Sequence, residues 1–181
     1  MGPITYSLCH KPVIGLAMWI TGLCTFWPPI PDTEISIRDS GLVLNKEFSA
    51  PVAKSYLFTL RFVFPSTEAR LKDKLVGQRH VGGYCTGGTE YEDVPLPDRS
   101  GLGLPIPLKV IVRTEPGGIP VAEQTFHSLC TTGHMTNDKI RDIGRLHLNE
   151  GTYRVEVYNL QPQPAFDGIA IRIRLGSGDA K

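Results

Sequence analysis

The sequence predicts an all-β protein, an antiparallel β-sandwich of the jelly-roll or immunoglobulin-like kind with two short helices. Three observations support this fold class. Several segments alternate apolar and polar residues with the period of two that characterises half-buried strands. Turn-forming residues are frequent, with 15 prolines and 19 glycines among 181 residues. The predicted strands recur at short intervals with turn signals between them, as they do in β-sandwiches.

The N-terminal segment predicts an export signal. Lys11 is followed by the apolar run VIGLAMWITGLC, and no acid occurs before Asp32. A basic residue, about a dozen apolar residues and then small residues are typical of a secretory signal peptide. We therefore interpret residues 1–24 as a signal peptide, with an uncleaved anchor or a buried strand as alternatives. The protein is expected to be exported, in the periplasm or associated with the outer membrane.

Cys24 ends this apolar run, at the place where a bacterial lipoprotein carries its lipid, and is therefore the lipidation candidate. Leu23 stands where a lipoprotein signal prefers a small residue, so ordinary cleavage after Cys24 is the alternative. Both alternatives remove Cys24 from the folded core. The proline-rich residues 25–34 predict a spacer. A single β-sandwich domain is expected over 35–176, with a flexible tail at 177–181.

The strands follow from alternation. YLFTLRFVF places large apolar side chains on one face, namely Tyr56, Phe58, Leu60, Phe62 and Phe64. PLKVIVR, TYRVEVYNL and GIAIRIRL repeat the pattern, and ISIRDSGLVL reads as one or two shorter strands. Charged residues at the alternate positions indicate that one face of each strand meets water. The NEG sequence at residues 149–151 predicts a hairpin between RLHL and TYRVEV.

Two short helices and one long loop interrupt the strands. STEARLKDKLVG has Ser66 as N-cap and Gly77 as a stop, whereas TNDKIRDIG has Thr136 or Asn137 as N-cap and Gly144 as a stop. The region from Gly77 to Leu104 has no clear period, which predicts a binding loop. Its candidate contact residues are Tyr84, Glu90, Tyr91, Glu92 and Asp93.

A cluster of three acids in this loop, Glu90, Glu92 and Asp93, offers oxygen ligands of the kind that calcium prefers. They lack the alternating Asp/Asn spacing of a calcium loop. A solvated acidic loop is therefore the favoured interpretation.

The segment HSLCTTGH brings a cysteine and two histidines together. The folded domain then retains two cysteines, Cys85 and Cys130. In an oxidising compartment these two are expected to form a disulfide. It would close a loop of about 45 residues and contribute about 4 kcal/mol. Two free buried thiols and a zinc site are the alternatives, and the zinc ligands would come from His80, Cys85, His127, Cys130 and His134. A Cys–His hydrolase would need Cys130 with His127 or His134, and no third orienting residue is identifiable.

The net charge of the mature domain argues against two classes of partner, nucleic acids and anionic lipids. Residues 1–24 contain one Lys and no acid, so the mature domain has equal numbers of basic and acidic residues. Nucleic-acid binding relies on surplus positive charge, so we expect no nucleic-acid partner. Neutrality also argues against docking on anionic lipid, so we expect membrane contact only through the N-terminal segment or a lipid.

Five stretches of the mature chain carry a family resemblance, namely KEFSAPVAKSYLFTLRFVF, ARLKDKLVGQRHVGGY, IPLKVIVRTEPGG, RLHLNEGTYRVEVYNL and IAIRIRL. Through them the chain resembles a bacterial envelope/lipoprotein family catalogued as domain of unknown function 5625. The resemblance extends from about Ile35 to Leu175. The resemblance implies a β-sandwich exposed to the periplasm or the outer-membrane surface, and it implies no catalytic residues.

The sequence lacks a Gly-x-Ser-x-Gly elbow, a His-Glu-x-x-His zinc helix and a phosphate loop. We therefore expect a non-enzymatic exported module without cofactor that binds another protein, for example an immunity protein against a delivered toxin. One alternative is a carbohydrate-binding envelope protein with Tyr84, Tyr91 and Tyr158 as its aromatic candidates. The others are a metal-dependent or Cys/His hydrolase and a structural envelope component. The sequence does not predict the oligomeric state.

Overall fold

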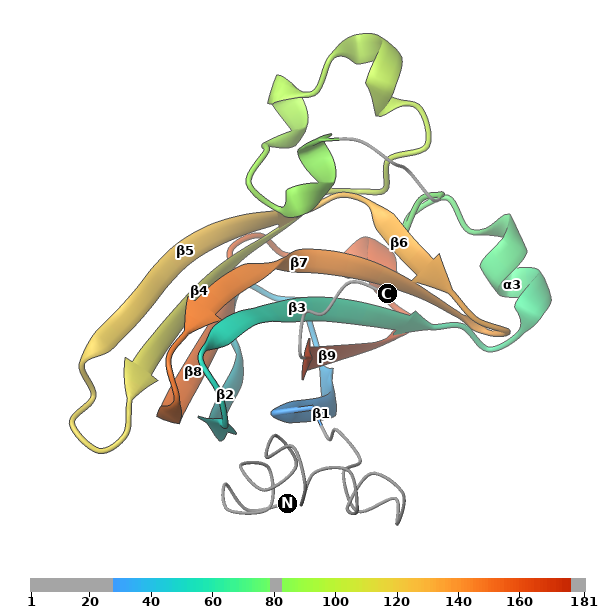
Figure 1. Ribbon diagram of the computed structural model, residues 1–181. Coiled ribbons are helices and arrows are strands. Elements are labelled where there is room, and N and C mark those ends of the chain that lie inside the picture. The colour runs from blue at the N-terminus through green and yellow to red at the C-terminus, as the bar shows by residue number, and fades with distance from the viewer. Residues whose placement is uncertain (1–27, 79–82, 177–181) are drawn as a thin grey trace, which may run out of the picture.

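The computed structural model describes residues 28–78 and 83–176, which form two packed antiparallel sheets (Figure 1). In that part of the chain one sheet has five strands in the order β1-β9-β3-β7-β6, and the other has four in the order β2-β8-β4-β5. The strands are β1 Ile30–Ile35, β2 Gly41–Ala50, β3 Lys54–Val63, β4 Ile106–Thr114, β5 Pro120–Ser128, β6 Thr131–His134, β7 Asp138–Leu148, β8 Gly151–Asn159 and β9 Ala170–Gly176. The expected sandwich is therefore confirmed.

The core lies between the two sheets, and the alternation predicted for β3 is confirmed. Tyr56, Phe58, Leu60 and Phe62 are at most 1% exposed. The opposite sheet contributes valines of β4 and β8 that are fully buried, namely Val110, Val112, Val155 and Val157. Burial of each large apolar side chain is worth about 1.5–3 kcal/mol, so this interior dominates the stability of the sandwich.

The first predicted helix exists but is short. The helix α3 spans Thr67–Lys72, and the Ser66 hydroxyl accepts a hydrogen bond from the Ala69 N–H at 3.1 Å. The helix ends before the predicted stop at Gly77. The carboxylate of Asp73 accepts the backbone N–H groups of Leu75 and Val76, which turns the chain out of the helix.

The second predicted helix is wrong, because TNDKIRDIG is the beginning of β7. Lys139, Arg141 and Ile143 are spaced by two and are all buried on one side of the strand. The expected stop, Gly144, has a packing role instead. A Cβ at this position would lie 2.1 Å from the Phe126 ring. Glycine thus lets that ring approach the strand.

The predicted hairpin at residues 149–151 is also corrected. This turn leads from β7 of the five-stranded sheet into β8 of the four-stranded sheet. The Tyr153 hydroxyl donates to the Asn149 carbonyl at 3.1 Å and fixes the crossing. The short connection therefore joins the layers of the sandwich and not two neighbouring strands.

The ends of the domain differ from expectation at one point. Ile30 is buried and pairs with Leu175 of β9, so β1 begins within the segment for which a spacer was expected. The predicted signal peptide, Cys24, His80 and the predicted tail lie outside the described residues.

Within 28–78 and 83–176, no helix is both long and apolar enough to span a membrane.

Candidate functional site

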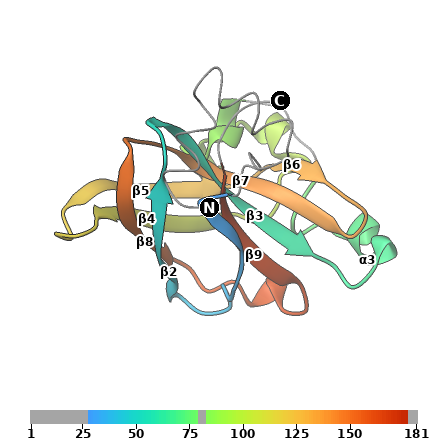
Figure 2. The ribbon, with the colours of Figure 1, turned by 60° about the horizontal axis from the view of Figure 1, so that its bottom comes forward.

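The long irregular segment forms a projection that we call the knob, residues 83–100. It contains the 3-10 helices η1 Gly83–Thr86, η2 Tyr91–Asp93 and η3 Leu96–Arg99. Figures 1 and 2 both show these coils outside the two sheets, near β6 and β7. The structure contains the Cys85–Cys130 disulfide, which ties the knob to the connection between β5 and β6.

The knob has a small core of its own. Val94 is buried together with Leu129 and Cys130, and the two predicted contact tyrosines, Tyr84 and Tyr91, pack around them. The Tyr84 hydroxyl donates a hydrogen bond to the Asp98 carboxylate. The tyrosines therefore hold the knob together, and they do not form a free aromatic surface.

Arg99 fixes the chain around this small core. Its guanidinium lies over the Tyr91 ring at 5.0 Å. It donates to the carbonyls of Val94 and Glu92 at 2.8 and 2.7 Å. Such an arrangement combines a cation–π contact with charge-assisted hydrogen bonds. The contacts of Arg99 therefore stabilise the knob itself.

The two chain segments that connect the knob to the sandwich form its neck, residues 75–78 and 101–104. They are paired with each other. The Leu104 N–H donates to the Leu75 carbonyl at 2.8 Å, and the Gln78 N–H donates to the Gly101 carbonyl at 2.9 Å. A third bond, from the Gly103 N–H to the Leu129 carbonyl at 3.1 Å, attaches the neck to the β5–β6 connection.

Arg141 of β7 is the centre of the neck, and its side chain is 0% exposed. Its guanidinium donates to main-chain carbonyls at 2.8–3.0 Å, namely those of Leu75, Val76, Leu104 and Ser128. It also lies over the Phe62 ring at 5.4 Å. Burial lowers the pKa of Arg141 to about 9, with Asp73 opposing the shift, so the guanidinium remains charged at neutral pH.

Lys139, two residues before Arg141, holds the other side of the neck. Its ammonium forms an ion pair with the Asp73 carboxylate at 2.7 Å and donates to the Gly77 carbonyl at 2.7 Å. Both partners of this pair are buried. Neither cation was selected as a site residue from the sequence. Their spacing of two in β7 places both on one face of the strand, but two cations in a row of alternate residues do not mark that face as the inner one.

Among the described residues, the predicted ligands Cys85, His127, Cys130 and His134 do not assemble into a metal site. Cys85 and Cys130 are joined in the disulfide. His127 lies on β5, with Nε2 3.8 Å from the Glu90 carboxylate, and His134 is exposed at the end of β6. Across the described ranges there is no group of three or more His, Cys, Asp and Glu side chains that could hold a metal ion.

The surface of the knob is acidic and carries one prominent apolar side chain. Glu90, Glu92 and Asp93, three of the predicted contact residues, are exposed. Leu96 lies between two prolines on η3 and is 77% exposed, more than any other large hydrophobic residue among those that the structure describes. Leu96 was not among the contact residues predicted from the sequence. Its position between prolines in an otherwise irregular loop was the available signal.

One glycine lets the backbone of the knob pack closely against the sandwich. Gly87 has φ +84°, and a Cβ there would lie 1.8 Å from the Ile143 carbonyl oxygen. We expect Gly87→Ala to lower the free energy of unfolding by about 2–3 kcal/mol, because it adds backbone strain to a clash. Urea unfolding measures this loss. Gly88→Ala is the matched control, since no atom lies within 4 Å of its Cβ, and an equal loss in both variants would contradict the account.

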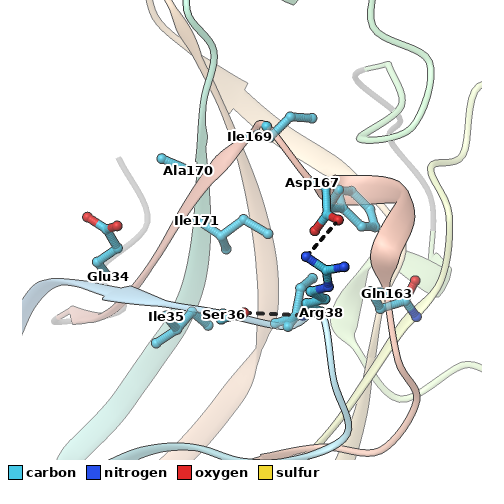
Figure 3. Close-up of a pocket in the computed structure, with 12 residues that line it drawn as sticks. Glu34, Ile35, Ser36, Arg38, Gln163, Asp167, Ile169, Ala170 and Ile171 are labelled. Atoms are coloured by element: carbon cyan, nitrogen blue, oxygen red, sulfur yellow. Dashed lines mark hydrogen bonds and ion pairs between the residues drawn. The ribbon is translucent and has the colours of Figure 1, made fainter.

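The pocket in Figure 3 lies apart from the knob. It has a volume of about 150 Å³ and is lined by the end of β1, residues 36–38 and the segment that leads into β9. An exposed ion pair, Arg38 with Asp167 at 3.4 Å, stands at its edge. Ligand pockets usually measure about 300–1,000 Å³. This hollow is therefore a weaker candidate than the knob.

The fold and the site define a β-sandwich with a disulfide-bonded surface knob. The chain belongs to the family described as Domain of unknown function (DUF5625), whose model matches residues 32–177. A crystal structure of a protein from Sulfurospirillum deleyianum is similar in fold, with a TM-score of 0.60 and 18% sequence identity. That similarity covers 85% of this chain and 100% of the other. No curated protein matches the chain.

Proposed function

We propose that this protein is a non-enzymatic binding module that recognises another protein through its knob. The observation that carries the proposal is Leu96, a leucine that is 77% exposed on a segment fixed from several sides. The disulfide, the small core and the neck restrict the motion of the knob before binding. A fixed surface loses less conformational entropy when it binds a partner. The restricted motion of the knob therefore favours binding there. Exposed apolar anchors surrounded by polar residues are common in protein interfaces.

The sequence supports a more specific version of this proposal. The module acts in the periplasm or at the outer membrane after export, and it blocks a delivered toxin as an immunity protein does. Inhibition by occlusion requires only a complementary surface, which a small module can provide. The carbohydrate-binding alternative receives less support, because Tyr84 and Tyr91 pack within the knob.

We expect Leu96→Asp to reduce capture of the partner from an extract of cells that naturally make the protein by at least tenfold. The substitution places a charge at the apolar centre of the proposed interface. Quantitative mass spectrometry of the captured proteins measures the change. The fold should be unaffected, because Leu96 is not part of a buried cluster.

Leu160→Asp is the matched control, since Leu160 is also exposed but follows β8. It should retain the full capture of the wild type. If the Leu96 and Leu160 variants capture the same proteins in the same amounts, the knob is not the binding surface.

A further inference from the structure

The β5 strand presents a free backbone edge beside the knob. It is the outermost strand of its sheet and runs from the β4–β5 turn to the base of the knob (Figure 1). From Pro120 to Thr125 its residues are exposed, apart from the half-buried Ala122. A strand at a sheet edge carries unpaired N–H and C=O groups that a further strand can bind.

One hydrogen bond shows which groups of β5 face outwards. The His127 N–H points away from β4 and donates to the Gly87 carbonyl at 2.7 Å. Because backbone direction alternates along a regularly paired strand, the N–H and C=O groups of Thr125 and Glu123 face the same way. Those of Gln124 face β4. The knob therefore closes the edge at His127 and leaves the edge open towards the β4–β5 turn.

The other edges of the described sheets are less available. In the five-stranded sheet, β6 has 4 residues, and β1 has 6 residues with a register irregularity after Ile30. In the four-stranded sheet, β2 has a register irregularity between Leu42 and Leu44, and its Lys46 side chain donates to Thr33 of β1 at 3.0 Å. Irregular and short strands are ordinary means of protecting an edge. β5 has its own register irregularity at its outer end, between Pro120 and Ala122, and pairs regularly with β4 from Ala122 to Ser128. Its edge is therefore open over Glu123–Thr125.

Charge along this edge indicates the kind of strand that fits. Glu123 lies on the open stretch, and its side chain is 53% exposed although it pairs with Lys109 at 2.5 Å. At the closed end the knob adds the exposed Glu90, Glu92 and Asp93. An incoming strand with basic side chains would therefore meet one carboxylate on the open stretch, that of Glu123, and several at its knob end.

We propose that the edge of β5 binds an extended basic segment of a partner protein as an additional strand. Main-chain hydrogen bonds to Glu123 and Thr125 supply the affinity, and carboxylates at Glu123 and on the knob select basic side chains. This inference rests on the proposed function, since it describes how the same partner extends from the knob along the sheet.

The test uses a synthetic nine-residue peptide of alternating lysine and threonine or valine, blocked at both ends, with the full folded domain. Amide hydrogen exchange is followed by NMR. We expect at least tenfold added protection at Glu123 and Thr125 and little change at Gln124, whose N–H is already bonded to β4. A peptide with glutamate in place of lysine should bind at least tenfold more weakly.

Two proline variants provide the matched pair. Glu123→Pro removes an outward N–H and should weaken peptide binding at least tenfold while the domain stays folded, because edge strands tolerate proline. Gln124→Pro removes a hydrogen bond to β4 and should destabilise the domain instead. Glu123→Gln keeps the backbone donor and should lose binding only partly. Thr125→Pro repeats the test of Glu123→Pro at a second outward position.

Three results would overturn the inference: no added protection at the alternating amides, equal binding by Glu123→Pro and the wild type, or concentration-dependent protection without peptide. The last result would assign the edge to a second copy of this chain. The outcome is separable from that for the knob, since Leu96→Asp should leave peptide binding unchanged. If Leu96→Asp loses capture of the partner and the wild type does not bind the peptide, the added strand is refuted. The proposed function of the knob would still stand.

Discussion

Arg141→Ala is expected to lower the free energy of unfolding by about 4 kcal/mol. The substitution removes the donors from the buried carbonyls of the neck and leaves a cavity where the guanidinium lay against Phe62. Each buried carbonyl without a partner costs about 1–3 kcal/mol, less where it finds water or a new donor. Urea unfolding, followed by circular dichroism, measures the loss of free energy of unfolding.

Two further variants test whether the loss of stability is specific to the Arg141 guanidinium. Arg174→Ala removes an exposed arginine of β9 and should change stability by less than about 0.5 kcal/mol. Arg141→Lys keeps the charge but lacks the planar fork that reaches several carbonyls, so it should recover only part of the loss. A loss below about 1 kcal/mol for Arg141→Ala would show that the neck does not depend on this side chain.

The double substitution Cys85→Ser with Cys130→Ser should lower the free energy of unfolding by about 4 kcal/mol. The disulfide closes a loop with a sequence separation of 45 residues, and the chain-entropy model gives this magnitude for a loop of that length. Since the knob has only a small core, we expect its amides to lose protection first. Hydrogen exchange should therefore rise most across residues 83–100, whereas the amides of β3 should lose protection only by the fall in global stability.

The reduced wild-type protein provides the control for the disulfide and should show the same regional pattern. Uniform loss of protection across β3 and the knob would contradict the account, because it would mean that the knob and the sandwich unfold as one unit. Unchanged exchange over 83–100 would mean that the neck alone fixes the knob.

The sequence contains enough information to predict the sandwich, because its strands expose one face and bury the other. Alternation in YLFTLRFVF predicts the buried face of β3 directly, since Tyr56, Phe58 and Leu60 are all in the core. The same rule fails at TNDKIRDIG, where buried Lys139 and Arg141 make the inner face of β7 look polar. Cap-like residues before them and Gly144 after them then imitate a helix.

The site was less predictable, because its parts depend on contacts between distant segments. A disulfide between Cys85 and Cys130 follows from the few cysteines and the expected compartment. The carbonyl partners of Arg141 come from the neck and from Ser128, and no local pattern relates them. Tyr84 and Tyr91 illustrate the reverse error: aromatic residues in an irregular loop suggest a contact surface, but here they pack inside the knob.

Site-specific photo-cross-linking from position 96 tests the central claim most directly, namely that the knob is where this module binds another protein. A photoreactive residue is placed at position 96 in one variant and at position 160 in another, and each protein is produced in its natural cells. The account predicts one discrete cross-linked protein from position 96 and none from position 160. Adducts from both positions alike, or from position 160 alone, would contradict it.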